Sequence, residues 1–151
     1  MEDRQNAIVE TYLERALSFD ELRGECLSLA QRNFQGKTFT NKATGRVIRV
    51  SRQGLGEWKM KSKTREQILS IKILDVMLEN AAFDHDAPDE KERLNIENFS
   101  YFNYLCVING LAFKAIITVK RTQDYSDIYY HHYLEDKKIE PRSGTAPILT
   151  N

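Results

Sequence analysis

Apolar residues recur at three- and four-residue steps in two stretches of the chain, and this spacing predicts helices. The first stretch covers residues 4–32. It contains Ser18 followed by Glu21, a capping box in which hydroxyl and carboxylate satisfy free amides at a helix start. We therefore predict two helices joined near Phe19. A third helix is predicted over residues 64–82, with an apolar stripe formed by Ile68, Ile71, Leu74, Met77 and Leu78.

Residues 37–63 have a different pattern. Threonines are followed by a turn at 41–45 and by apolar residues among basic ones around Val47 and Val50. This predicts short strands around a glycine-rich turn at Gly54, Leu55 and Gly56. The acidic segment 84–94 contains a proline and has no apolar period, so an exposed loop is predicted there.

The strongest local pattern lies at Asn109 and Gly110, between two apolar runs. Type I′ turns need positive φ at both central residues, which Asn-Gly tolerates, so a tight hairpin is predicted. A two-residue loop pairs Ile108 with Leu111. Working outward, one face collects Phe102, Tyr104, Cys106, Phe113, Ala115 and Ile117, and the other collects Tyr101, Asn103, Leu105, Val107, Ala112, Lys114, Ile116, Thr118 and Lys120. The aromatic run 128–135 predicts a third antiparallel strand.

Length and charge narrow the class of protein. The 151 residues suit one domain, and 22 basic residues balance 22 acidic ones, so a binding surface must come from local segregation of charge. No run of about 18 apolar residues is present, and the start is acidic and helix-patterned, so we expect a cytoplasmic protein without a membrane partner. Cys26 and Cys106 lack CxxC spacing and are predicted to be buried free thiols.

Three groups of residues could carry chemistry. The first is a basic segment that could bind phosphate and contains Arg46, Arg49, Arg52, Lys59, Lys61 and Lys63. The second is His131 and His132 among three tyrosines, since histidine transfers protons near neutral pH and tyrosine rings stack on bases. The third lies on the hairpin and comprises Lys114, Thr118 and Lys120. A solvated charged strand and ordinary packing histidines are the plain alternatives.

The absence of several motifs excludes whole classes of enzyme. The sequence contains no Walker loop, HExxH, GxSxG or zinc-ligand spacing, which excludes nucleotide hydrolases, metalloproteases and serine hydrolases. No metal or cofactor is expected. Strand alternation places His132 with Ile128, Tyr130 and Leu134, and His131 with Tyr129 and Tyr133. Only one of the two histidines can therefore point into a given site.

The order of several motifs resembles that of a known family. The motifs are FTNKATGRVIRVSRQG, a lysine-rich segment, VMLENAAF, YFNYLCVINGLAFKAIITVK and YYHHYLED. Over residues 34–135 they resemble the phage-associated barnase/EndoU/colicin/RelE-like nuclease family, also described as a large polyvalent protein-associated domain. The resemblance implies an α+β fold in which N-terminal helices pack on an antiparallel sheet of about four strands. It divides the chain into an N-terminal helical segment (1–33), a nuclease domain (34–138) and a flexible tail (139–151).

The same resemblance implies metal-independent RNA cleavage, in which the ribose 2′-hydroxyl attacks the adjacent phosphate and leaves a 2′,3′-cyclic end. The reaction needs a base, an acid and cations. On the family pattern Tyr130 and His132 match best, with Lys61 or Lys59 and Arg49 as phosphate-stabilising cations, and with Thr118 and Lys120 from the TVK strand. We expect the catalytic group to be His132, His131, Tyr130 and Lys61, and the RNA-binding group to be Arg46, Arg49, Lys59, Lys114, Thr118 and Lys120. Such proteins are typically toxins or phage effectors. The expected partners are RNA, with tRNA as one candidate, and an immunity or antitoxin protein.

Two other functions stay open at this point. The chain could be a non-catalytic RNA- or protein-binding accessory module of a phage or mobile element, since such families place different side chains on a shared scaffold. It could also be an interaction domain in which the strand over 128–135 is an exposed edge that pairs with a partner.

Overall fold

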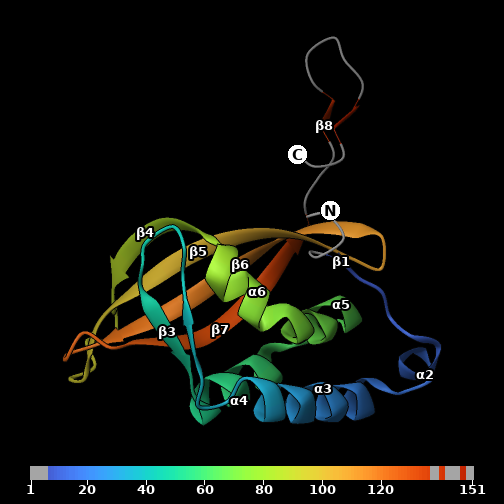
Figure 1. Cartoon of the computed structure of the whole chain (residues 1–151), viewed down its shortest axis with the longest axis horizontal. Helices are drawn as coiled ribbons and strands as arrows, with labels where there is room; N and C mark the ends of the chain where they lie inside the picture. The colour runs from blue at the N-terminus through green and yellow to red at the C-terminus, as the bar shows by residue number, and fades with distance from the viewer. Residues whose placement is uncertain (1–6, 137–139, 142–146, 149–151) are drawn as a thin grey trace.

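The computed structural model describes residues 7–136, 140–141 and 147–148, and it confirms the predicted α+β class (Figure 1). The helices are α2 (Tyr12–Arg15), α3 (Phe19–Asn33), α4 (Arg52–Lys61), α5 (Arg65–Leu69), the 3-10 turn η1 (Ser70–Ile73) and α6 (Leu74–Asn80). The strands are β1 (Ala7–Ile8), β2 (Thr38–Thr40), β3 (Val47–Val50), β4 (Ala82–Pro88), β5 (Ile96–Ile108), β6 (Leu111–Thr122) and β7 (Asp127–Asp136). A separate pair consists of β8 (Glu140–Pro141) and β9 (Pro147–Ile148).

The main sheet has seven strands, so the prediction of about four antiparallel strands was wrong. Its order is β1-β5-β6-β7-β3-β2, and β4 also pairs with β5. The strands β5, β6 and β7 form the predicted antiparallel meander, but β1 pairs with β5 and β3 pairs with β7 in parallel. Strands β2 and β3 lie within residues 37–63, where short strands were predicted, whereas β1 is only two residues long and carries little local signal.

The core lies between the helices and one face of the sheet. Helices α3, α4, α5 and α6 lie on this side (Figure 1), where Leu22 and Trp58 pack with Phe102, Ile117 and Tyr129 of the sheet. We call the opposite face of the sheet the outer face. Residues of the hairpin alternate between the two, as the register requires.

The predicted hairpin is confirmed in its turn and its register. Asn109 and Gly110 have φ values of 51° and 79°, and Ile108 pairs with Leu111. The capping box at Ser18 is also present, because the Glu21 amide donates to the Ser18 hydroxyl at 3.2 Å and the Ser18 amide donates to the Glu21 carboxylate at 2.9 Å. The turn and the capping box each depend on residues within a few positions of one another, so both could be predicted from the sequence.

Three predicted segments fold differently. The predicted glycine-rich turn lies inside helix α4, which begins after Ser51 because the Ser51 hydroxyl accepts a hydrogen bond from the Gly54 amide at 3.1 Å. Gly54 lets this helix approach β7 closely, since a Cβ at this position would lie 2.2 Å from the carbonyl oxygen of Tyr129. The predicted acidic loop contains strand β4, and the predicted first helix is preceded by β1 and shortened to α2.

The two cysteines are free and buried, as predicted. Burial raises the pKa of Cys26 and of Cys106 to about 11, so both thiols stay protonated at neutral pH. Among the helices of the described residues, none combines the length and the hydrophobicity needed to cross a membrane.

Candidate nucleic-acid interface

A β-bulge in β7 shapes the candidate site. Thr118 of β6 pairs with His131 and the next residue, Val119, pairs with Tyr129, so Tyr130 is an extra residue without a partner in the ladder. Because of this extra residue, Tyr129 and His132 both point into the core, although simple alternation separates them. The bulge presents Tyr130 on the outer face, where its ring lies 5.4 Å from that of Phe99.

His132 is a fully buried residue of the core. Its Nε2 lies 2.6 Å from the Ser70 hydroxyl, its Nδ1 lies 2.7 Å from the Tyr129 hydroxyl, and its carbonyl accepts from the Gln67 amide at 2.8 Å. The Ser70 hydroxyl already donates to the Gln67 carbonyl at 2.6 Å, so Nε2 carries the proton and Nδ1 accepts from Tyr129. Burial lowers the pKa of His132 to about 3, with a smaller contribution from His131. This arrangement makes His132 a structural link between β7 and α5.

His131 occupies the outer face and is half-buried. Burial, and then the charge of Lys61, lower its pKa to about 4, so the ring is neutral at physiological pH. Its Nδ1 is buried and has no hydrogen-bond partner among the residues that the structure describes. The ring centroid lies 5.0 Å from that of Tyr130. Of the two predicted histidines, His131 is therefore the one that lies next to the surface cations.

Several cations surround Tyr130. The Lys61 ammonium of α4 lies 5.5 Å from the centre of the Tyr130 ring, and the Lys120 ammonium of β6 lies 5.8 Å from it. Burial lowers the pKa of Lys120, and so do the charges of Arg93 and Arg49, while Glu57 opposes this effect. Arg93 and Arg49 therefore lie close enough to Lys120 to act on its charge, although burial has the larger effect on its pKa. We call the set Arg49, Glu57, Lys61, Arg93, Lys120, Tyr130 and His131 the Tyr130 surface.

Arg93 of this surface pairs with Asp89 through two hydrogen bonds. Its Nε and Nη2 donate to the two carboxylate oxygens of Asp89 at 2.9 and 3.0 Å. The guanidinium lies over the Phe99 ring, 5.5 Å from its centre. Asp89 and Tyr130 raise the pKa of Arg93 because both stabilise its charge. The connection between β4 and β5 therefore places the Arg93 guanidinium on the outer face.

Two rows of paired residues run across the sheet at this point. One row consists of Phe99, Lys120, Ile128 and Arg49 on β5, β6, β7 and β3. The next row consists of His85, Tyr101, Thr118 and His131 on β4, β5, β6 and β7. The rings of His85 and Tyr101 are stacked, with centroids 4.8 Å apart. The outer face therefore combines a cationic row with a neighbouring aromatic row.

The other predicted RNA-binding residues lie elsewhere or are engaged. Arg46 donates to the buried Asp127 at 2.7 Å and to Ser100 at 2.8 Å, and thus belongs to an internal network. Lys114 forms an ion pair with Glu135 at 3.8 Å. Thr118 lies in the aromatic row but is buried. Lys59 is exposed on α4, where two residues turn the helix by about 200° away from the direction of Lys61.

Sequence analysis missed Arg93, Phe99 and Glu57. The hairpin register could have revealed Phe99, because two further steps beyond the Tyr101–Thr118 pair give the Phe99–Lys120 pair that the structure shows. Arg93 and Glu57 have no such signal, since they reach the site from outside the hairpin. The described residues contain no cluster of three or more His, Cys, Asp or Glu that could hold a metal ion.

The fold and the site define an α+β domain whose outer sheet face carries a cluster of cations and aromatic rings. The family model described as large polyvalent protein-associated domain 3 matches residues 18–130. The chain belongs to this family. The match supports the polyvalent-protein part of the resemblance and not a nuclease family, and it begins upstream of Phe34, where the resemblance was expected to begin. No curated protein and no solved structure matches the chain.

Proposed function

We propose that this domain binds single-stranded RNA through the Tyr130 surface. The observation that carries the proposal is the position of the Lys61 and Lys120 ammonium groups over one tyrosine ring, with Arg93 of the β4–β5 connection and Arg49 of β3 close enough to act on the charge of Lys120. The charges of two of these cations are neutralised by ion pairs, since Lys61 pairs with Glu57 at 3.7 Å and Arg93 pairs with Asp89. Arg49 and Lys120 have no ion pair among the described residues and would supply the net charge.

The aromatic side chains give this surface a second means of holding RNA. Nucleic-acid-binding surfaces for single strands combine cations that follow the phosphates with rings on which bases stack. Tyr130 lies between the cationic row and the aromatic row, and its ring is partly exposed. A strand running along the bulge would place phosphates near Lys120 and Lys61 and a base near Tyr130.

The proposal is tested by fluorescence anisotropy with a labelled single-stranded RNA at several salt concentrations. Each phosphate contact contributes about 0.7 to the slope of log affinity against log salt for single strands. Replacing Lys120 by Ala is expected to weaken binding and to reduce the slope by about 0.7. Tyr130→Ala is expected to weaken binding by about 1–3 kcal/mol without changing the slope.

A matched control is Arg32→Ala. Arg32 is an exposed cation of α3, on the helical side of the sheet, and this variant is expected to bind like the original protein. If Lys120→Ala and Arg32→Ala have equal effects, binding does not involve the Tyr130 surface and the proposal is wrong.

RNA cleavage is the second candidate function, and His131 favours it. Its neutral, half-buried ring lies beside Tyr130 and Lys61. Such a ring could take the proton of a 2′-hydroxyl while the cations stabilise the phosphate. We expect cleavage in EDTA with a 2′,3′-cyclic phosphate end, and its loss in His131→Ala with RNA affinity retained. Intact RNA after prolonged incubation would leave binding as the function.

A further inference from the structure

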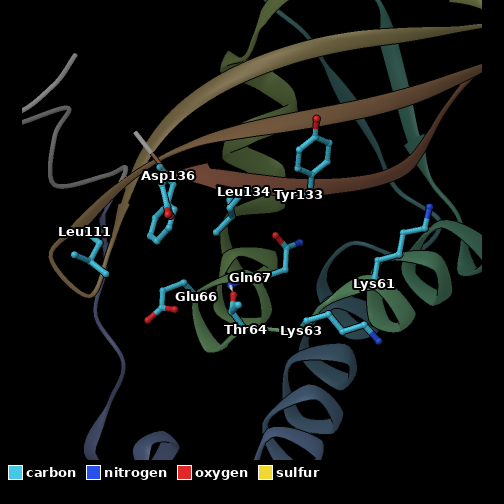
Figure 2. Close-up of a pocket in the computed structure, with 10 residues that line it drawn as sticks. Lys61, Lys63, Thr64, Glu66, Gln67, Leu111, Tyr133, Leu134 and Asp136 are labelled. Carbon is cyan, nitrogen blue, oxygen red and sulfur yellow. Dashed lines mark hydrogen bonds between the residues drawn. The ribbon is translucent and has the colours of Figure 1, made fainter. Parts of the chain in front are cut away.

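In the part of the chain that the structure describes, the second half of β7 has no neighbouring strand on the side away from β6. Strand β3 pairs only with Asp127, Ile128 and Tyr129, whereas β7 continues to Asp136. Beyond Tyr129, the connection between α4 and α5 lies beside β7 in place of a strand (Figure 2). The Gln67 side chain donates to the His132 carbonyl at 2.8 Å, as the amide of a neighbouring strand would.

This hydrogen bond shows which main-chain groups face the edge. In an antiparallel pair, the N–H and C=O of one residue point to the same side, and the side alternates from residue to residue. Since the His132 carbonyl points away from β6, the N–H and C=O of Leu134 do so too. Neither group has a partner among the described residues. Unpaired groups of this kind are a template for another strand.

A pocket of about 330 Å³ runs along this edge. Leu134 and Tyr133 form its β7 side, and the α4–α5 connection forms the other side. Charges of opposite sign lie at its two ends: Figure 2 shows Lys61 and Lys63 at one end and Glu66 and Asp136 at the other. The pocket therefore has an electrostatic direction along the strand.

We propose that the β7 edge from His132 to Asp136 binds an extended peptide segment of a partner protein by strand addition. The five residues span about 16 Å at 3.3 Å per residue, which fits a segment of five or six residues. Main-chain hydrogen bonds to Leu134 would hold the segment, and the two charged ends would select its sequence. The segment carries a carboxylate at the end near Lys63 and a cation at the end near Glu66. Lys61 belongs to both sites, but Lys63, Glu66 and Leu134, which select and hold the segment, lie outside the Tyr130 surface.

The test uses two capped peptides of the same composition, Glu-Val-Thr-Val-Thr-Lys and its reverse. The full-length protein labelled with 15N is titrated with each peptide, and the exchange rate of the Leu134 amide is measured. Because Lys63 precedes Glu66 along the direction of β7, binding of the first peptide indicates a parallel added strand and binding of the second an antiparallel one. We expect one peptide to bind and to slow Leu134 exchange at least tenfold. Replacing its central residues by proline should abolish binding, since proline cannot donate to the ladder.

The charge requirement is tested with Lys63→Glu, which is expected to weaken binding of the peptide at least threefold. Lys37→Glu is the matched control, because Lys37 is exposed next to β2, outside the pocket. The proposal is overturned if neither peptide shifts the Leu134 amide at about 1 mM, or if the proline peptides bind equally well. RNA is expected to leave the exchange rate of the Leu134 amide unchanged. Failure of the peptide proposal and failure of RNA binding are therefore distinguishable.

Discussion

The hydrogen bonds of His132 allow a quantitative test of the assignment of His132 to the core and of His131 to the outer face. Replacing His132 by Ala removes a fully buried ring and leaves a cavity, which costs about 2–5 kcal/mol for side chains of this size. It also removes the acceptor of the buried Tyr129 hydroxyl, which costs about 1–3 kcal/mol. We therefore expect a loss of about 5 kcal/mol in the free energy of unfolding. A typical domain has only about 5–15 kcal/mol in total.

The matched control is the adjacent residue of the same type. His131 is half-buried and its Nδ1 has no partner in the described part of the chain, so His131→Ala is expected to cost about 1 kcal/mol or less. Tyr129→Phe removes one donor and is expected to cost about 1–2 kcal/mol. The combination of His132→Ala with Tyr129→Phe should cost less than the sum by about 1 kcal/mol, because the two share one hydrogen bond.

The measurement is urea unfolding at pH 7, followed by circular dichroism. If His132→Ala is too unstable to fold, His132→Gln gives a smaller cavity and preserves the comparison. Equal losses for the variants at His131 and His132 would refute the assignment of His132 to the core. Additive losses for His132 and Tyr129 would refute the hydrogen bond between them.

Three further predictions concern pH, helix packing and the hairpin turn. The lowered pKa values of His131, about 4, and His132, about 3, mean that the unfolded chain binds protons below pH 6.5 that the folded protein does not. The free energy of unfolding should therefore fall by roughly 1.4 kcal/mol per pH unit for each histidine between pH 6.5 and about pH 4.5, and urea unfolding of His131→Ala should show half this slope. Gly54→Ala should lower stability by about 1–3 kcal/mol because its Cβ meets a β7 carbonyl, whereas Gly56→Ala, with open space around it, should raise stability by about 0.5–1 kcal/mol in thermal unfolding. Asn109→Ala should cost about 1–3 kcal/mol, because its left-handed φ of 51° is strained for Ala and its hydrogen bond to the Glu10 amide is lost; Asn109→Gly should recover part of this loss.

The parts of the fold that the sequence predicts are those determined by neighbours along the chain. Asn109 and Gly110 determine the register of β5 and β6 by turn geometry, and Ser18 with Glu21 determines the start of α3. Helix α4 was missed because its glycines are typical of turns. The close approach of Gly54 to Tyr129 depends on residues 75 positions apart, which no local pattern contains.

The candidate site was predictable to a similar extent. The aromatic and basic residue types pointed to Tyr130, His131, Lys61 and Lys120, and the structure brings these together. Arg46 was also a candidate, but its charge is used by Asp127, which lies 81 positions away. An ion pair of this kind depends on tertiary structure, so charge patterning along the chain does not reveal it.

The bulge at Tyr130 lets strand β7 keep its hydrogen-bond pairing with β6 and also present a side chain to a ligand at a position that takes no part in this pairing. On either side of it, His131 and Tyr129 pair with consecutive residues of β6, so a chain without residue 130 would keep both pairs and a regular ladder. The strand thus carries one position that hydrogen-bond pairing does not constrain. Substitutions there can change what the protein offers to a ligand while the registers on both sides, and the core histidine beneath, stay as they are. For the same reason, residue 130 is the place to introduce a new ring or charge when the specificity of this surface is to be altered.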